Sequence, residues 1–204
     1  MGRALIGTLV ERSHEVVALA RPGSEDKVPR GCRVVTGNAL DGDSYAPYLY
    51  AGDTFVQLVG VAHPGPGKAA EFQSIDRKSG MEAIRVAKQA AVGHFVYVSV
   101  AQPAPVMRQY IEARAACEAE LKASGLNATI LRPWYVLGPG HRWPYALIPF
   151  YWLAERIPAT REGARRLGLV TLAQMVGALT NAIEHPPEGI RIVGVPEMRS
   201  GAAA

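Results

Sequence analysis

The sequence contains few of the residues that crosslink a fold or bind a metal. Two cysteines, Cys32 and Cys117, occur in 204 residues without paired spacing. This predicts reduced thiols in a reducing compartment rather than a disulfide framework. The five histidines form no ligand-spaced pair, so no metal site is predicted. We therefore expect a cytoplasmic protein that holds no metal.

Long apolar runs and strong charge are also missing. The most apolar segment, residues 143–154, contains two prolines and is too short to span a bilayer. No N-terminal apolar run resembles a signal peptide. The net charge is +4, and the densest basic group is only Arg161, Arg165 and Arg166. A solvated basic face is therefore expected, with no membrane span and no nucleic-acid partner.

What is present is an alternation of short β-branched runs with longer helical ones. That order is typical of a parallel sheet with crossover helices in one α/β domain spanning residues 1–204. The segment 54–61 is nearly all apolar, as expected of a strand buried on both faces. The predicted strands are 15–20, 33–36, 54–61, 94–100, 129–131 and 190–193. The predicted helices are 3–12, 71–91, 108–124, 143–157 and 171–184.

The order of elements is unusual at the beginning. Doubly wound sheets normally open with a strand, whereas this sequence opens inside the helix predicted over 3–12. The strands at 15–20 and 54–61 would then lack a shared neighbour and expose backbone donors and acceptors, unless they pair with each other. We therefore expect that the natural protein is longer at its N-terminus, or that its start site is placed too late. The intact mass of the native product would decide this.

Four short motifs follow one another in a specific order. They are Gly2-Arg3-Ala4-Leu5, Gly37-Asn38-Ala39-Leu40-Asp41, Leu58-Val59-Gly60-Val61, and the segment 131–140, which reads LRPWYVLGPG. Together they resemble the short-chain dehydrogenase/reductase superfamily, in its extended and atypical branches that include NmrA-like and epimerase-like proteins. The resemblance runs from Gly2 to about residue 195. It implies a Rossmann-like doubly wound parallel sheet that lacks its first strand and most of its glycine-rich loop.

The same resemblance implies how the chain is divided and which cofactor it takes. Residues 1–140 would form the NAD(P)-binding part, and residues 141–204 a small substrate-side elaboration. Gly2 matches the third glycine of the phosphate loop, which allows close packing of helix and strand. Arg21 stands where NAD-specific members carry an acid, with Arg3 nearby. A guanidinium pairs well with a 2′-phosphate, so NADP is preferred, although a surface arginine is the alternative.

Three further stretches would touch the cofactor. Asn38 and Ala39 border the adenine, while the backbone at Val59 and Gly60 approaches the adenosine half. An ordinary turn and ordinary core explain those two stretches equally well. The strongest local match is the third stretch, whose backbone would hydrogen-bond the carboxamide: Pro133, Trp134, Tyr135 and Val136.

The resemblance also implies a catalytic pair with one departure. Tyr110 stands at the family's proton-transferring tyrosine, and Arg114 replaces the lysine four residues later, a spacing that puts both side chains on one helix face. Arginine keeps the charge that favours tyrosinate, but its planar group cannot reproduce the compact contact of an ammonium with the ribose. Ser99 matches the serine that hydrogen-bonds the substrate oxygen.

Two classes of function follow from these residues. The first is an NAD(P)-dependent reductase, dehydrogenase or epimerase acting on a small carbonyl or hydroxyl substrate. The second is a non-catalytic NAD(P)-binding sensor or assembly module, which the lysine-to-arginine change favours. The apolar segment 143–157 suits a lid, a homo-oligomer contact or core, and core is the default expectation.

Overall fold

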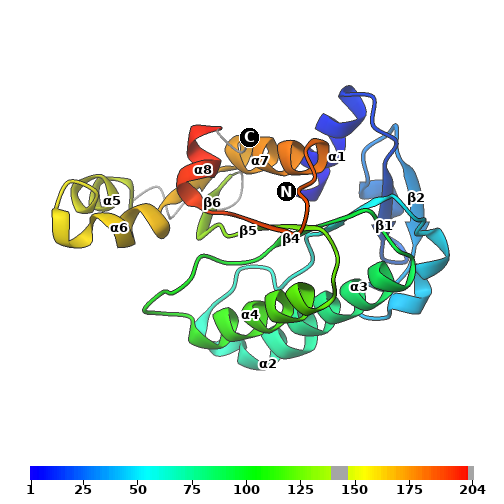
Figure 1. The fold of residues 1–204 in the computed structure, drawn as a ribbon, viewed down its shortest axis with the longest axis horizontal. Coiled ribbons are helices and arrows are strands. Elements are labelled where there is room, and N and C mark those ends of the chain that lie inside the picture. The colour runs from blue at the N-terminus through cyan, green and yellow to red at the C-terminus, as the bar shows by residue number, and fades with distance from the viewer. Residues whose placement is uncertain (139–146, 202–204) are drawn as a thin grey trace.

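The fold is built on a parallel sheet, which crosses the middle of the molecule in Figure 1. The computed structural model describes residues 1–138 and 147–201. Four strands pair in the order β3-β4-β5-β8, and every pairing is parallel. These strands are β3 (Thr54–Gln57), β4 (His94–Val98), β5 (Ala128–Leu131) and β8 (Ile190–Val193). The predicted α/β fold class with a parallel sheet is confirmed.

Two smaller parallel ladders flank this sheet. One joins β1 (Val17–Ala20) to β2 (Arg33–Thr36), and the other joins β6 (Tyr135–Leu137) to β7 (Leu169–Thr171). No ladder joins β1 to β3 in the described part of the chain, so the two strands do not close up against each other. The outward-facing side chains of β1 remain exposed as a result: Val17 is 45% exposed and Leu19 39%.

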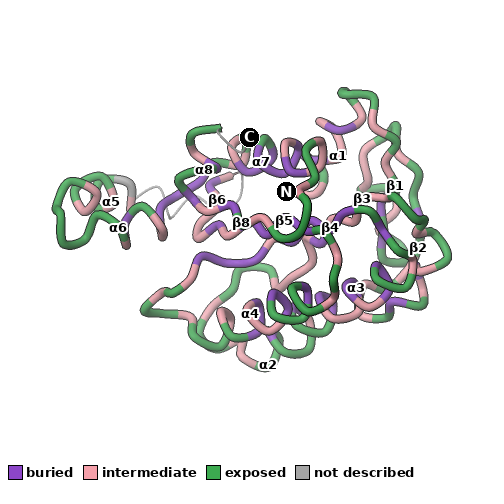
Figure 2. Tube along the Cα trace, in the orientation of Figure 1, coloured by how far each residue is buried: buried purple, intermediate pink, exposed green. Residues whose placement is uncertain are grey.

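Helices cover the sheet on both sides, and each side has its own apolar core. Along β4, Phe95 and Tyr97 join one cluster while Val96 joins the other, as the alternation of side chains along a strand requires. Figure 2 shows the buried segments concentrated in the strands and on the inner faces of the helices. One cluster lies under α1 (Gly2–Glu11), α7 (Leu172–Glu184) and α8 (Val195–Ser200). The other lies under α3 (Lys78–Gln89) and α4 (Arg108–Ala123).

The long helix predicted over 71–91 is divided into three parts. A short helix α2 (Ala69–Glu71) leads into a π-helical segment, Phe72–Arg77, which leads into α3. The wider π turn brings Phe72 and Asp76 together onto the buried face, where each is 1% exposed. Because π-helical turns concentrate at functional sites, this irregularity directs attention to Asp76. Short 3₁₀ turns occur at Glu25–Lys27, Gly42–Ser44, Ala46–Tyr48 and Pro66–Lys68.

Two expectations about burial are wrong. The strand predicted over 54–61 ends at Gln57, and its first three residues are only half-buried because β3 lies at the edge of its sheet. The apolar segment predicted as core contains α5 (Ile148–Ala154), where Phe150 is 71% exposed and Trp152 59%. Together with α6 (Pro158–Arg166), α5 projects away from the sheet in Figure 1. Residues 143–146 of that prediction lie outside the described residues.

Candidate cofactor and catalytic site

The candidate site lies at the edge where the parallel strands end. Gly60 follows β3, Ser99 follows β4 and Arg132 follows β5, so the three residues come to the same edge of the sheet. Ligands of doubly wound sheets bind at this edge. Helix α4 runs along one face of the sheet and contributes Tyr110, Arg114 and Glu118 to the same region.

Arg114 and Asp76 form a buried ion pair at the centre of the site. Arg114 Nη2 lies 2.5 Å from Asp76 Oδ1, with side-chain exposures of 6% and 0%. Arg114 Nη1 donates to the carbonyl oxygen of Val98 at 2.9 Å, and Asp76 Oδ2 accepts from the backbone N–H of Val61 at 3.1 Å. The pair therefore ties α4 and the π-helical segment to the ends of β3 and β4.

Burial and the neighbouring charges have opposite effects on the pKa values of this pair. Burial raises the pKa of Asp76, and the nearby Arg114 guanidinium and the Val61 N–H oppose that rise. Burial would lower the pKa of Arg114, but Tyr110, Tyr97 and Asp76 outweigh it and raise the pKa. Arg114 is therefore a fixed cation at the edge of the sheet.

Tyr110 lies over this cation. The guanidinium carbon of Arg114 is 5.4 Å from the centre of the Tyr110 ring and 5.8 Å from that of Tyr97. On its other side, the Tyr110 ring packs against Phe72 at 5.0 Å between centroids. Tyr110 and Arg114 thus share one helix face, as their spacing of four requires.

Glu118, one turn further along α4, is the centre of a second buried polar network. Ser99 Oγ donates to Glu118 Oε1 at 2.6 Å, and Gln102 Nε2 and Arg132 Nε each donate to the same oxygen at 3.0 Å. A second contact joins Arg132 Nη2 to Glu118 Oε2, which makes the arginine–carboxylate pair bidentate. Glu118 is 2% exposed. The network fixes the direction of the Ser99 hydroxyl proton, which points at the carboxylate.

Backbone glycine at position 60 is required by the Arg114 side chain. A Cβ added to Gly60 would lie 2.0 Å from Arg114 Nη2 and 2.7 Å from Asp76 Oδ1. The cation therefore touches the very backbone that the family motif assigns to the adenosine half of the cofactor. At the start of α1, a Cβ on Gly2 would lie 3.7 Å from Leu58 Cδ1, so the helix N-terminus lies beside the end of β3.

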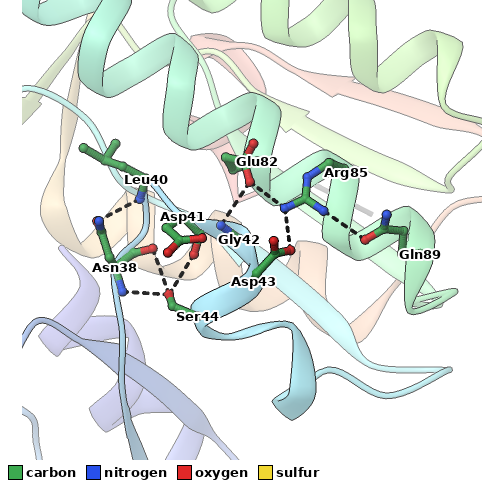
Figure 3. Close-up of polar contacts among 9 residues, drawn as sticks. All are labelled: Asn38, Leu40, Asp41, Gly42, Asp43, Ser44, Glu82, Arg85 and Gln89. Carbon is green, nitrogen blue, oxygen red and sulfur yellow. Dashed lines mark hydrogen bonds and ion pairs between the residues drawn. The ribbon is translucent and has the colours of Figure 1, made fainter.

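Asn38 lies in an ordered turn after β2, drawn in Figure 3. Its Oδ1 accepts from the N–H of Leu40 at 3.0 Å, and its own N–H donates to Ser44 Oγ at 2.9 Å. The turn is anchored to α3 because Glu82 Oε2 accepts from the N–H of Gly42 at 3.0 Å. The side-chain oxygen of Asn38 is therefore engaged within its own turn.

The remaining residues predicted to hold the cofactor lie in α1, after β1, in the β5–β6 connection and in β6. Arg21 follows β1 directly and is exposed, as is Arg3 in the first turn of α1. The carbonyl oxygen of Pro133 accepts from the N–H of Ala101 at 2.9 Å, and Tyr135 and Val136 pair with β7. Trp134 packs edge-on against Tyr135 at 5.7 Å. Part of the backbone that the motif assigns to the carboxamide is thus already hydrogen-bonded within the protein.

A cavity of about 520 Å³ adjoins the Glu118 network. Gln102 and Arg132 form its inner wall, and Arg161, Arg165 and Arg166 of α6 line it from the opposite side. None of the predicted cofactor residues is among its described lining residues. In the described residues, no cluster of histidine, cysteine, aspartate and glutamate could hold a metal ion.

Sequence reasoning missed Asp76, Glu118 and Gln102. Glu118 is four residues after Arg114, so helical spacing places it on the face that carries this site residue. Asp76 is four residues after Phe72, so the same spacing places it on an apolar face. That spacing was the available signal. Gln102 follows a strand end without any local pattern, and only the folded structure brings it to Glu118.

Comparisons with known proteins agree with this geometry. The family model described as NAD(P)H-binding matches residues 1–142. A search of curated protein sequences found no match. Among solved structures, the Bordetella bronchiseptica enzyme WbmH in complex with NAD+ has a TM-score of 0.68 at 19% identity, covering 96% of this chain and 74% of that chain.

Two further structures have the same fold. The Thermus thermophilus UDP-glucose 4-epimerase complex with NAD has a TM-score of 0.66 at 18% identity, covering 100% of this chain and 80% of the other. The DesIV double mutant (dTDP-glucose 4,6-dehydratase) of Streptomyces venezuelae, with NAD and DAU bound, has a TM-score of 0.67 at 17% identity, with coverages of 95% and 72%. The Rossmann-like fold that the predicted resemblance implies is confirmed. The family match spans more than half of the sequence, and the chain therefore belongs to the NAD(P)H-binding family.

Proposed function

We propose that the protein is an NAD(P)-dependent oxidoreductase of the short-chain dehydrogenase/reductase type that acts on a small carbonyl or hydroxyl substrate. The observation that carries the proposal is the stack of Tyr110 over Arg114, 5.4 Å from ring centre to guanidinium carbon, at the edge where the strands end. A phenol held beside a buried cation at the ends of the strands is placed to exchange a proton with a substrate.

In this proposal each residue has a distinct task. The cofactor supplies or accepts the hydride. Tyr110 exchanges the proton with the substrate oxygen, while Arg114 acts through Tyr110 as a positioning residue. Both terminal nitrogens of Arg114 are engaged by Asp76 and Val98, so it does not take over the ribose contact of the family lysine. Ser99 donates to Glu118 and so offers a substrate hydroxyl an acceptor.

The residues that would hold the dinucleotide come from the start of α1, from the segments that follow β1, β2, β3 and β5, and from β6. Their chemistry fits the cofactor: small residues stand where the backbone is approached, and amide and guanidinium groups stand where an adenine edge and a phosphate would lie. They are Gly2, Arg3, Arg21, Asn38, Ala39, Val59, Gly60, Pro133, Trp134, Tyr135 and Val136.

Tyr110→Phe is expected to lower turnover roughly 100- to 10,000-fold, the usual contribution of a positioned acid–base group, while NADPH binding stays unchanged. Turnover would be followed by NADPH absorbance with a panel of small aldehydes and ketones, and binding by NADPH fluorescence titration. Tyr50→Phe removes a hydroxyl from an exposed tyrosine and should leave both unchanged. Turnover by the Tyr110→Phe variant equal to that of the wild type would overturn the assignment of Tyr110.

We further propose that the cofactor is NADP rather than NAD, because Arg21 offers an exposed guanidinium to a 2′-phosphate. Arg21→Glu is expected to weaken NADPH binding roughly 10- to 100-fold and leave NADH binding equal or stronger, since a charged hydrogen bond is worth about 1.5–3 kcal/mol. The control is Arg30→Glu, which makes the same change of charge at another exposed arginine, away from the site. A similar NADPH loss in both variants would mean a general effect of charge.

The second candidate function is a non-catalytic NAD(P)-binding sensor or assembly module. The observation that favours it is the internal engagement of Arg114 and Ser99, which donate to Asp76, Val98 and Glu118. If the protein is a sensor, the wild type and the Tyr110→Phe variant should bind the nucleotide equally well, and neither should reduce a carbonyl compound. Turnover by the wild type that the variant loses would exclude it.

A further inference from the structure

Several strongly exposed apolar side chains lie close together in the sequence of the α5–α6 segment. The α5–α6 segment (residues 148–166) projects from the body of the molecule (Figure 1). Within it, Phe150 is 71% exposed, Trp152 59%, Leu153 55% and Ile157 45%. Scattered exposed apolar residues need no explanation, but four within eight residues of a projecting element are concentrated enough to call for a partner; we call these four residues the α5 patch.

Unpaired positive charge accompanies this patch. The carboxylates of the segment are already engaged, Glu155 by Arg199 at 2.7 Å and Glu162 by Arg166 at 3.5 Å. Three exposed arginines remain, and none of them has a carboxylate partner in the described part of the chain: Arg156, Arg161 and Arg165. The guanidinium carbon of Arg156 lies 3.3 Å from the centre of the Trp152 ring, so cation and aromatic form one surface.

We propose that the α5–α6 segment docks the protein onto the surface of an anionic lipid bilayer. Trp152 and Phe150 suit the boundary between headgroups and acyl chains, and arginines suit the anionic headgroups. In the described residues no helix is long and apolar enough to cross a membrane, so the contact is peripheral. A second copy fits less well, because its patch would bring the same three uncompensated arginines against these three.

The arrangement also places the membrane beside the cavity. Arg161 and Arg165 belong both to the α5–α6 segment and to the wall of the 520 Å³ cavity next to the Glu118 network. A bilayer bound at α5 would therefore lie next to the mouth through which a substrate enters. The docking itself rests on the patch and its charge, and it does not depend on the proposed catalytic role.

Co-sedimentation with vesicles tests the proposal. The full chain is expected to bind vesicles of phosphatidylcholine and phosphatidylglycerol at 70:30 and to remain in the supernatant with phosphatidylcholine alone. Phe150→Ser combined with Trp152→Ser, and separately Arg161→Glu combined with Arg165→Glu, should each lower the partition coefficient by roughly tenfold or more. Tyr50→Ser removes an equally exposed aromatic elsewhere and should not change it.

Two further measurements separate lipid binding from other causes. Tryptophan emission should shift to the blue on adding the anionic vesicles, and the Trp152→Phe variant should lose that shift. Circular dichroism of each variant checks that the fold is retained. The proposal would be overturned by equal binding to both vesicle types or by no binding to either. It would also be overturned if light scattering showed a dimer that the Phe150→Ser, Trp152→Ser variant does not form.

Discussion

Asp76→Asn is expected to lower the free energy of unfolding by about 3–5 kcal/mol, because it leaves the buried Arg114 guanidinium without a counter-charge. The asparagine keeps an acceptor for the Val61 N–H, so the loss reports on the charge. The pair is almost entirely inaccessible to water, with side-chain exposures of 6% and 0%. Urea unfolding followed by circular dichroism at neutral pH measures the difference.

Two further variants test whether the loss of stability comes from the buried, unpaired charge. Asp43→Asn breaks an ion pair with Arg85 in which the aspartate side chain is 80% exposed, and it should cost less than about 1 kcal/mol. Adding Arg114→Met to Asp76→Asn should restore much of the lost stability, because the orphaned charge is removed. A double variant as unstable as the sum of the two single ones would contradict the account.

Acidification from pH 6.5 to about 4 should remove about 3 kcal/mol of stability through His94 alone. Burial, with a smaller contribution from the nearby charge of Arg191, lowers the pKa of His94 from 6.5 to about 4. The side chain is 2% exposed and Nε2 lies 3.0 Å from Thr129 Oγ1. Between these two pH values the unfolded chain binds the proton and the folded chain does not, so stability rises with pH across this window and falls on acidification.

His94→Gln isolates that contribution. Glutamine can keep a hydrogen bond to Thr129 but does not titrate. The free energy of unfolding of this variant should therefore change less with pH than that of the wild type between pH 4.5 and 6.5. His185→Gln changes an exposed histidine and should keep the wild-type slope. Identical slopes for wild type and His94→Gln, measured by urea unfolding at several pH values, would refute the role of His94.

The parts of the fold that could be predicted are those encoded by local periodicity. Strands β2 and β8 have the predicted limits, and α7 begins where Thr171 accepts from the N–H of Gln174 to form a capping box. In contrast, the three-residue strands β6 and β7 are too short to have a period, and their pairing joins segments more than thirty residues apart. The helix α6 was missed because its charged sequence has no continuous apolar stripe.

The site was only partly predictable for a similar reason. The spacing of Tyr110 and Arg114 fixes their common face within one helix, and the structure agrees. The partners of Arg114 and Ser99 come from elsewhere: Asp76 lies in a π-helical segment, and Glu118 receives donors from the connections after β4 and β5. The exposed α5 side chains misled the prediction because apolar composition does not distinguish core from a projecting surface.

The contact between Gly60 and Arg114 makes evolution at these two positions interdependent. Arginine occupies the space that any side chain at position 60 would need, since an added Cβ would lie 2.0 Å from its Nη2. Lysine at 114 would not by itself make room for alanine at 60, because the same Cβ would lie 2.7 Å from Asp76 Oδ1. Positions 60, 76 and 114 therefore constrain one another, and a side chain at 60 requires both partners of the ion pair to move or change.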